Sequence, residues 1–257
     1  MTLKTKSAFI YGHTFDDTNQ YLDFSEDGIT ELTAIIEDGS YSISEVADIV
    51  AQALNDVGDN TYTVTLDRVT RKFTISADGN FDLYVTTGSN VATSAYALLG
   101  FLIDKSGSNS YESDGASGSI YRPQAKLYNY VDFNDIEEAA NAVVNISTDG
   151  SEVETVSFGQ VNFMECNIRY VTDITGQGYL DDNPNAVSEL RIFMQYITKK
   201  RPIEFIPDRD DLEVYTKCFL ERTQKSSQGT AFELKELYSQ GLAFYFESGL
   251  LVFRRLD

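Results

Sequence analysis

The sequence is poor in the residues on which many enzymes and metal sites depend. It has one histidine, His13, and no tryptophan among 257 residues. A single histidine excludes a histidine-based metal site, and a Ser–His or Cys–His catalytic pair would have to use His13 in a polar N-terminal segment. No P-loop and no dinucleotide-binding glycine pattern is present. We therefore expect no catalytic residue, no metal and no cofactor, and a protein that is not an enzyme.

Long apolar runs are also missing. No stretch of about 18 apolar residues occurs, so the sequence predicts no membrane span. Residues 1–6 lack the apolar core of a secretion signal, which predicts synthesis in a cytosol. In that compartment Cys166 and Cys218, both in strand-like segments, are expected to be buried thiols, with a disulfide as the alternative.

Positive charge is scarce in the first part of the chain. The formal net charge is −20; residues 1–184 hold 29 acidic and 9 basic residues, whereas residues 185–257 hold 11 of each. The acidic excess argues against specific nucleic-acid binding. It is compatible with a surface that repels DNA, such as the lining of a DNA conduit. The alternative is that acidity simply keeps the protein soluble.

Residues 21–103 have the pattern of a first α+β domain. Strands are predicted near 21–24 and 29–36, followed by a helix whose apolar residues recur at spacings of three and four from Ile43 to Val57. The alternation in residues 62–75 predicts a β-hairpin, and residues 81–85 predict a third strand.

A short helix over 91–99 would end the first domain, with Gly100 at its C-terminal cap. Leu98, Leu99 and Phe101 are then expected to close the apolar core of the domain. Two polar segments flank it: residues 1–20, which we interpret as an N-terminal arm, and residues 104–119, rich in Gly and Ser, which we interpret as a flexible linker.

Residues 120–257 are predicted to form a second, β-rich domain. The pattern indicates a short helix over 135–144, a hairpin turn at 149–150, and a strand over 163–170 with the Cys166 face buried. A helix starting near Pro184, strands at 203–206 and 214–220, and a final hairpin turning at 248–249 complete it. The fold class is therefore α+β, with mainly antiparallel, β-sandwich-like domains and a few packed helices.

Charged residues cluster at several places in the last part of the chain. Residues 207–213, PDRDDLE, lack the central glycine and the twelfth-position glutamate of a calcium loop, so we interpret them as a solvated acidic turn. The basic residues of the last quarter are candidates for contact with acidic neighbouring subunits, although the first three also suit the capping of a helix end. These interface candidates are Lys199, Lys200, Arg201, Arg254 and Arg255.

The order of elements in the first domain resembles a segment of tailed-bacteriophage virion proteins. Residues 39–43, GSYSI, are followed by VADIVAQAL, by YTVTLDRVTRKFTIS, by FDLYVTTGSN and by AYALLGF. The resembling family has a Gly-x-Tyr-x-Ile start, a helix, a hairpin, a third strand and a closing Leu-Gly-Phe. The match covers about residues 29–102. Two C-terminal stretches, ITKKRPIEFIPDRDD and LKELYSQGLAFYFESGLLVFRR, are similar to tail-associated phage proteins.

This resemblance implies a structural protein made in the host bacterial cytoplasm and located in the virion. Its expected role is assembly as a homo-oligomer, in multi-copy rings of the tail tube, baseplate or neck. Its expected partners are copies of itself and other phage tail or neck proteins. The alternative is a capsid decoration protein or a receptor- or glycan-binding, fibre-associated module, for which Tyr111, Tyr121, Tyr128 and Tyr130 are candidate contact residues.

Overall fold

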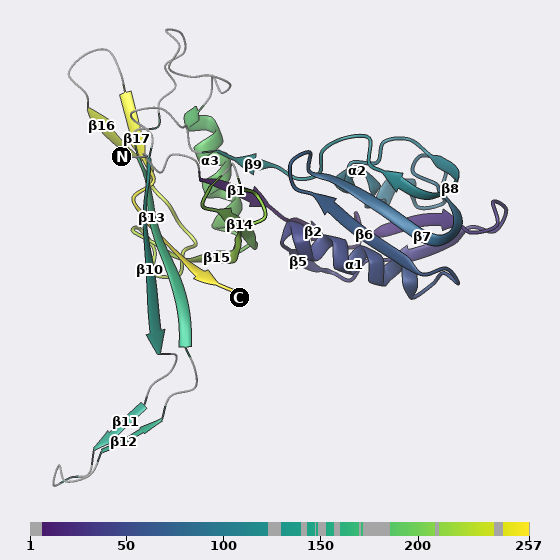
Figure 1. Cartoon of the computed structure of the whole chain (residues 1–257). Coiled ribbons are helices and arrows are strands. Elements are labelled where there is room, and N and C mark those ends of the chain that lie inside the picture. The colour runs from purple at the N-terminus through teal and green to yellow at the C-terminus, as the bar shows by residue number, and fades with distance from the viewer. Residues whose placement is uncertain are drawn as a thin grey trace. The chain divides into compact units, whose positions relative to one another are not determined.

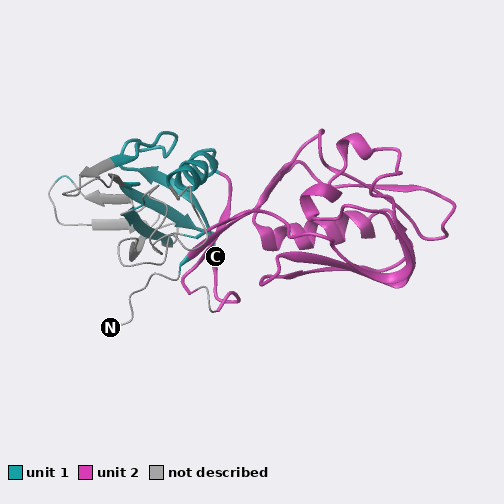
Figure 2. Cartoon of the chain, turned by 90° about the horizontal axis from the view of Figure 1, so that it is seen from above, with its two compact units in different colours: residues 1–7, 122–200, 216–257 teal, residues 8–121, 201–215 magenta. Residues whose placement is uncertain are grey.

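The computed structural model describes residues 7–122, 130–139, 143–146, 148, 153–156, 160–169, 171, 186–208, 211–238 and 244–256. The chain divides into two compact units (Figure 2). Unit 1 comprises residues 1–7, 122–200 and 216–257. Unit 2 comprises residues 8–121 and 201–215. Among the described residues, no helix has the length and apolar character needed to cross a membrane.

Unit 2 contains one long helix packed on an antiparallel sheet (Figure 1). Its described elements are β1 (Ala8–Tyr11), β2 (His13–Phe15), β3 (Tyr21–Ser25), β4 (Leu32–Ile35), β5 (Gly39–Tyr41), α1 (Ile43–Asn55), β6 (Tyr62–Asp67), β7 (Lys72–Leu83), η1 (Val91–Thr93), α2 (Tyr96–Leu99), β8 (Lys105–Glu112), β9 (Ile120–Tyr121) and β14 (Ile203–Ile206). The main sheet has the order β4-β3-β7-β6, and β8 also pairs with β7. β1 lies between β9 and β14, and β2 pairs with β5.

Helix α1 begins where its sequence can satisfy the free N–H groups of the first turn. The Glu45 backbone N–H donates to Ser42 Oγ, and the Ser42 N–H donates to the Glu45 carboxylate at 2.8 Å. This reciprocal capping box stabilises the helix start. The apolar stripe of α1 is buried against strand residues, among them Phe24, Phe73 and Ile75, and together they form the core of unit 2.

Unit 1 is built on an antiparallel sheet with the strand order β10-β13-β18-β15. Its described elements are β10 (Tyr130–Ala139), β11 (Val143–Ile146), β12 (Val153–Val156), β13 (Gln160–Arg169), α3 (Ala186–Ile197), β15 (Thr216–Thr223), β16 (Lys235–Tyr238), β17 (Phe244–Glu247) and β18 (Leu250–Arg255). The residues of α3 that are buried recur at helical spacing: Val187, Leu190, Phe193, Met194 and Ile197. The α+β class with mainly antiparallel sheets is therefore confirmed.

Cysteines 166 and 218 are both buried free thiols, in β13 and β15. On β13, Met164, Cys166 and Ile168 are buried while their neighbours are half-buried, so the predicted buried face is the observed one. The alternation follows from the two-residue period of a strand that lies on a core.

The N-terminal segment differs from the expected arm. Within residues 7–20, Ala8–Tyr11 form β1 and His13–Phe15 form β2, and most of their side chains are buried. Phe9 packs on Phe205 with ring centroids 5.1 Å apart. Four consecutive apolar or aromatic residues here belong to a strand covered on both faces, a pattern that lacks the alternation of a half-buried strand.

The expected linker at 104–119 also differs, because Lys105–Glu112 form strand β8. Its main chain pairs with β7, and the Tyr111 hydroxyl donates to the Phe81 carbonyl oxygen at 2.8 Å. An edge strand gains its stability from the ladder of main-chain hydrogen bonds, so serine-rich sequence suffices there. β7 continues to residue 83 along its pairing with β8. The third strand that the sequence predicts at residues 81–85 is therefore the end of β7.

Two predictions in the second half are wrong. The expected helix over 135–144 is the end of β10 and the start of β11, because β10 pairs with β13 over ten residues. The expected final hairpin does not form, since β17 pairs with β16 while β18 pairs with β13 and β15. The Asp149–Gly150 turn and Pro184 lie outside the described residues, although β11 and β12 pair on either side of that turn.

Candidate functional site

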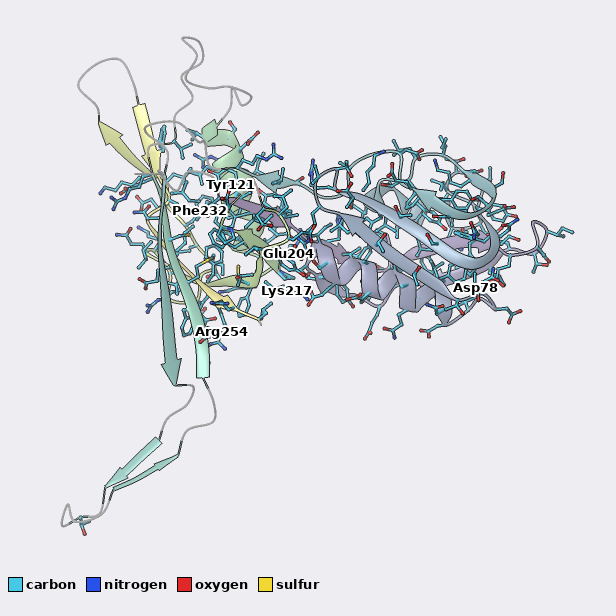
Figure 3. The ribbon with its side chains drawn as sticks, in the orientation of Figure 1. Asp78, Tyr121, Glu204, Lys217, Phe232 and Arg254 are labelled. Atoms are coloured by element: carbon cyan, nitrogen blue, oxygen red, sulfur yellow. The ribbon has the colours of Figure 1, made fainter. Side chains whose placement is uncertain are left out.

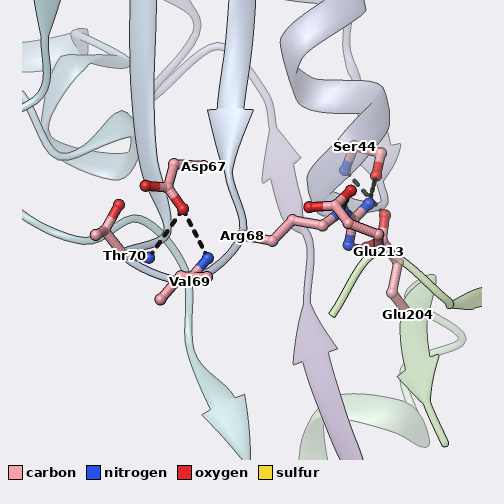
Figure 4. Close-up of polar contacts among 7 residues, drawn as sticks. All are labelled: Ser44, Asp67, Arg68, Val69, Thr70, Glu204 and Glu213. Carbon is pink, nitrogen blue, oxygen red and sulfur yellow. Dashed lines mark hydrogen bonds and ion pairs between the residues drawn. The ribbon is translucent and has the colours of Figure 1, made fainter. Parts of the chain in front are cut away.

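A buried ion cluster in unit 2 joins the two stretches of chain that make up this unit (Figure 4). Arg68 Nη1 donates to Glu204 Oε2 at 2.6 Å, and the other Glu204 oxygen accepts the Ser44 backbone N–H at 3.0 Å. Arg68 also donates to the Ser44 hydroxyl. Glu204 is fully buried and Arg68 is 7% exposed. The first turn of α1, the turn after β6 and strand β14 therefore meet at one ion pair.

The surroundings of Arg68 complete its contacts. Its guanidinium carbon lies 3.6 Å from the centre of the Tyr215 ring, and its Nε lies 3.9 Å from a carboxylate oxygen of the exposed Glu213. A planar guanidinium can donate from separate nitrogens to Glu204 and Ser44 while its face stacks on the Tyr215 ring. The sequence analysis does not predict this cluster. Its one signal in the sequence is Arg68 itself, an arginine in a part of the chain that has few basic residues.

The expected core-closing residues lie in the core of unit 2. Leu99 and Phe101 are 1% and 0% exposed, and Leu98 is partly buried against the same cluster. Gly100 has a φ of 86°, and a Cβ at this position would collide with the Gly115 carbonyl oxygen. Only glycine fits there, because the left-handed turn and the close backbone approach coincide.

His13 lies in a more ordered place than its polar sequence neighbours suggest. It is buried in β2, and its Nε2 is 2.8 Å from Ser117 Oγ. Burial lowers the pKa of His13 from 6.5 to about 4, so the ring is neutral at pH 7. Within the described residues, no cluster of three or more His, Cys, Asp or Glu side chains could hold a metal ion.

The acidic turn at 207–213 is solvent-exposed where it is described. Asp208 and Asp211 are exposed, and Asp210 lies outside the described residues. Glu213 of this turn lies within 3.9 Å of the buried Arg68, and Leu212 packs against the core of unit 2.

The first three candidate interface residues occupy different environments. Lys199 is exposed after α3. Lys200 Nζ instead donates to the carbonyl oxygens of Leu220 and Glu221 at 2.5 and 2.7 Å, and partial burial lowers its pKa while Glu221 opposes that shift. Arg201 is half-buried and belongs to unit 2. Lys200 is therefore engaged within unit 1, although the sequence made it a candidate for contact with a neighbouring subunit.

The two C-terminal candidates lie on β18. Arg254 is paired with Glu221 at 3.2 Å and its guanidinium carbon lies 5.6 Å from the centre of the Phe163 ring; Figure 3 labels it on unit 1. Arg255 is half-buried. The structure therefore brings Lys200 and Arg254 to the same residue, Glu221.

Two of the four tyrosines considered for ligand binding, Tyr111 and Tyr121, have described side chains, and both are engaged. Tyr121 is 3% exposed, and Tyr111 is half-buried with its hydroxyl bonded to β7. Tyr128 lies outside the described residues. Neither Tyr111 nor Tyr121 offers a free ring to a glycan.

Strands β10 and β13 form an antiparallel ladder that continues past the rest of the unit 1 sheet. The ladder has ten register pairs, from Tyr130–Arg169 to Ala139–Gln160, whereas β18 pairs with β13 only over Phe163–Asn167. The chain between the two strands carries the β11–β12 hairpin. We call β10–β13 with β11–β12 the β-arm.

The β-arm lies in a stretch of one charge sign. Residues 127–168 contain eight acidic residues and no lysine or arginine. Three of the acids, Asp135, Glu137 and Glu138, fall in the last five positions of β10, where the ladder nears and passes the end of its pairing with β18.

The outer face of α3 has the opposite character. Arg191, Ile192 and Gln195 are exposed on one side of α3, and Lys199, four residues after Gln195, is exposed in the turn that follows the helix. Ile192 is 56% exposed. Within the described residues neither Arg191 nor Lys199 has an ion-pair partner. We call these four residues the α3 face.

Comparison with known proteins adds little. A scan against protein-family models found no match, and neither did a search of curated proteins. Among solved structures, the crystal structure of selenomethionine-labelled mavirus penton protein matches over 98% of this chain and 84% of that chain, with 8% identity and a TM-score of 0.28. A TM-score this low does not establish a shared fold.

Proposed function

We propose that this chain is a structural subunit of a tailed-bacteriophage virion, assembled in several copies as a ring of the tail, the baseplate or the neck. The observation that supports this most directly is the order of elements from Gly39 to Phe101. That block, identified by its sequence resemblance, folds as β5, α1, the β6–β7 hairpin and the short α2 that ends at Gly100. The proposal assigns no catalytic role.

The β-arm supports an assembly role independently of the resemblance. Only five of the ten register pairs of this ladder lie where β13 also pairs with β18, so half of the ladder extends beyond the sheet. Extended segments of this kind gain their stability when a neighbour covers them. The near-neutral segment 185–257 remains the proposed contact region, since surfaces that carry most of a −20 charge repel copies of themselves.

Purified particles test this proposal. We expect quantitative mass spectrometry to find the chain in the particles, in a copy number that is a multiple of three or six, and gold-labelled antibody to bind at the tail or neck. Labelling spread over the capsid, with a copy number close to that of the capsid proteins, would favour a decoration protein. Absence from particles in which all other structural proteins are present would contradict a virion role.

A further inference from the structure

The outer edge of β10 is an available main-chain surface. β10 pairs with β13 on one side, and within the described residues no strand pairs with its other side. An open strand edge attracts other strands, and natural proteins limit such pairing by placing charges along it. Four of the ten residues of β10 are acidic. These charges disfavour pairing with another acidic β-arm and favour a positively charged partner surface.

The α3 face has the complementary properties. It presents two cations without described partners and an isoleucine that is more than half exposed. Three other described cations of unit 1 lie near carboxylates: Lys225 near Glu233 at 2.8 Å, Lys235 near Glu247 at 3.5 Å and Arg222 near Glu165 at 3.7 Å. Arg191 and Lys199 have no such partner among the described residues, so a carboxylate brought by a neighbouring copy would be attracted to them.

We propose that the α3 face of one copy of this chain binds the acidic β-arm of a second copy. The contact would place Arg191 and Lys199 against the carboxylates at the end of β10, and Ile192 would lose its exposure. The proposal rests on the assembly function inferred above and identifies the surfaces through which copies meet. Because charges are screened over about 8 Å at physiological salt, such a contact works only at short range.

Cross-linking of the full-length protein tests this contact directly. Equal amounts of ¹⁴N- and ¹⁵N-labelled chain are mixed and treated with a zero-length carbodiimide, which joins a lysine amine to a carboxylate. We expect peptides that contain Lys199 joined to peptides from residues 130–139, with one light and one heavy partner. Links with both partners always of the same isotope would show a contact within one chain and overturn the proposal.

Charge reversal provides the second readout. In sedimentation experiments, the double variant Arg191→Glu/Lys199→Glu is expected to raise the dissociation constant of self-association at least about tenfold. The matched control, Lys225→Glu with Lys235→Glu, changes the net charge equally at paired sites and should have a smaller effect. Mixing the α3 variant with Glu137→Lys/Glu138→Lys chain should restore association.

The outcomes separate this contact from the broader function. Normal self-association of the α3 variant, or failure of the mixed variants to restore it, overturns the arm-to-α3 contact while leaving the virion role intact. A chain that is monomeric at all concentrations and gives no mixed-isotope links also overturns the contact. The analysis of particle content decides the virion role separately.

Discussion

At the scale of single residues, the ion pair of Arg68 and Glu204 shows how a few buried charges position distant parts of the chain. The two residues are 136 positions apart, and both are almost completely removed from solvent. Removing one partner of such a pair leaves the other charge buried without compensation, which costs far more than the pair contributes as a whole.

We expect Glu204→Ala to lower the free energy of unfolding by about 3–5 kcal/mol, measured by denaturant titration. The double variant Glu204→Leu/Arg68→Met should lose less than Glu204→Ala, since no unpaired charge remains. The control is Glu213→Gln, whose carboxylate is exposed and 3.9 Å from Arg68, with an expected change of about 0.5 kcal/mol or less. Equal losses for Glu204→Ala and Glu213→Gln would contradict the burial argument.

The single histidine gives a pH prediction. Folding lowers the pKa of His13 to about 4, so the unfolded chain takes up this proton first as pH falls from about 6.5. The stabilising contribution is complete above pH 6.5 and is lost as pH falls to 4, about 3 kcal/mol in total. We expect His13→Gln to show a flatter loss of stability in this window. Identical pH profiles for the two proteins would show that His13 does not titrate as its burial requires.

At the scale of elements, α2 is a short helix that places the side chains of Tyr96 and Leu99 in the core. Phe101 follows the glycine cap, and its ring meets that of Tyr96 edge-on with centroids 6.0 Å apart. The Tyr96 hydroxyl donates to the Asp23 carbonyl oxygen at 2.9 Å, which holds α2 to β3.

We expect Leu99→Ala or Phe101→Ala to lower the free energy of unfolding by about 2–5 kcal/mol, because each leaves a cavity in a closed core. Leu102→Ala is the neighbouring control, since Leu102 is 58% exposed and its truncation should cost little. Thermal melts of all three variants provide the measurement. A Phe101 variant that melts like the wild type but no longer assembles would assign this stretch to an interface instead.

The end of α3 offers a contrast between adjacent lysines. Lys200, with a φ of 62°, turns back to donate to two carbonyl oxygens of β15, while Lys199 is exposed. We expect Lys200→Glu to lower the free energy of unfolding by about 1–3 kcal/mol, because two carbonyls lose their donor. Lys199→Glu should leave the melting temperature nearly unchanged. A similar melting temperature for both variants would restore the simple picture of an exposed basic helix end.

At the scale of the whole molecule, unit 2 is assembled from two separated stretches of chain. Residues 201–215 supply β14, which pairs with β1, and Ile206, which joins the core. A fragment that ends at residue 121 therefore lacks β14, one of the two strand partners of β1, and the carboxylate that compensates Arg68.

We expect residues 1–121 expressed alone to unfold at lower temperature and with less cooperativity than the same fragment fused through a flexible linker to residues 201–215. Circular dichroism melts and amide hydrogen exchange at Ala8–Tyr11 provide the measurements. In the fused control, residues 8–11 should regain their protection. Equal stability of the two fragments would mean that β14 adds little to unit 2.

Much of the local structure follows from the sequence alone, since the signals are local. The helix from Ile43 and the hairpin from Tyr62 are encoded by capping residues and by apolar periods of 3.6 and 2. The same holds for the left-handed glycine at position 100. The charge split between the two parts of the chain, and the resemblance that led to the proposed function, are likewise properties of the sequence.

Tertiary structure decided what depends on distant partners. Residues 105–112 and 135–139 are strands because β7 and β13 offer them main-chain hydrogen bonds, although their own composition favours a linker and a helix. The return of β14 to unit 2, the Arg68–Glu204 pair and the separate positions of Lys199 and Lys200 depend on the same long-range contacts. The periodicity of apolar side chains predicts which face of an element is buried. A strand at a sheet edge is instead held by hydrogen bonds of backbone N–H and C=O groups, which nearly every residue carries. Sequence periodicity therefore does not predict which segment pairs with such an edge.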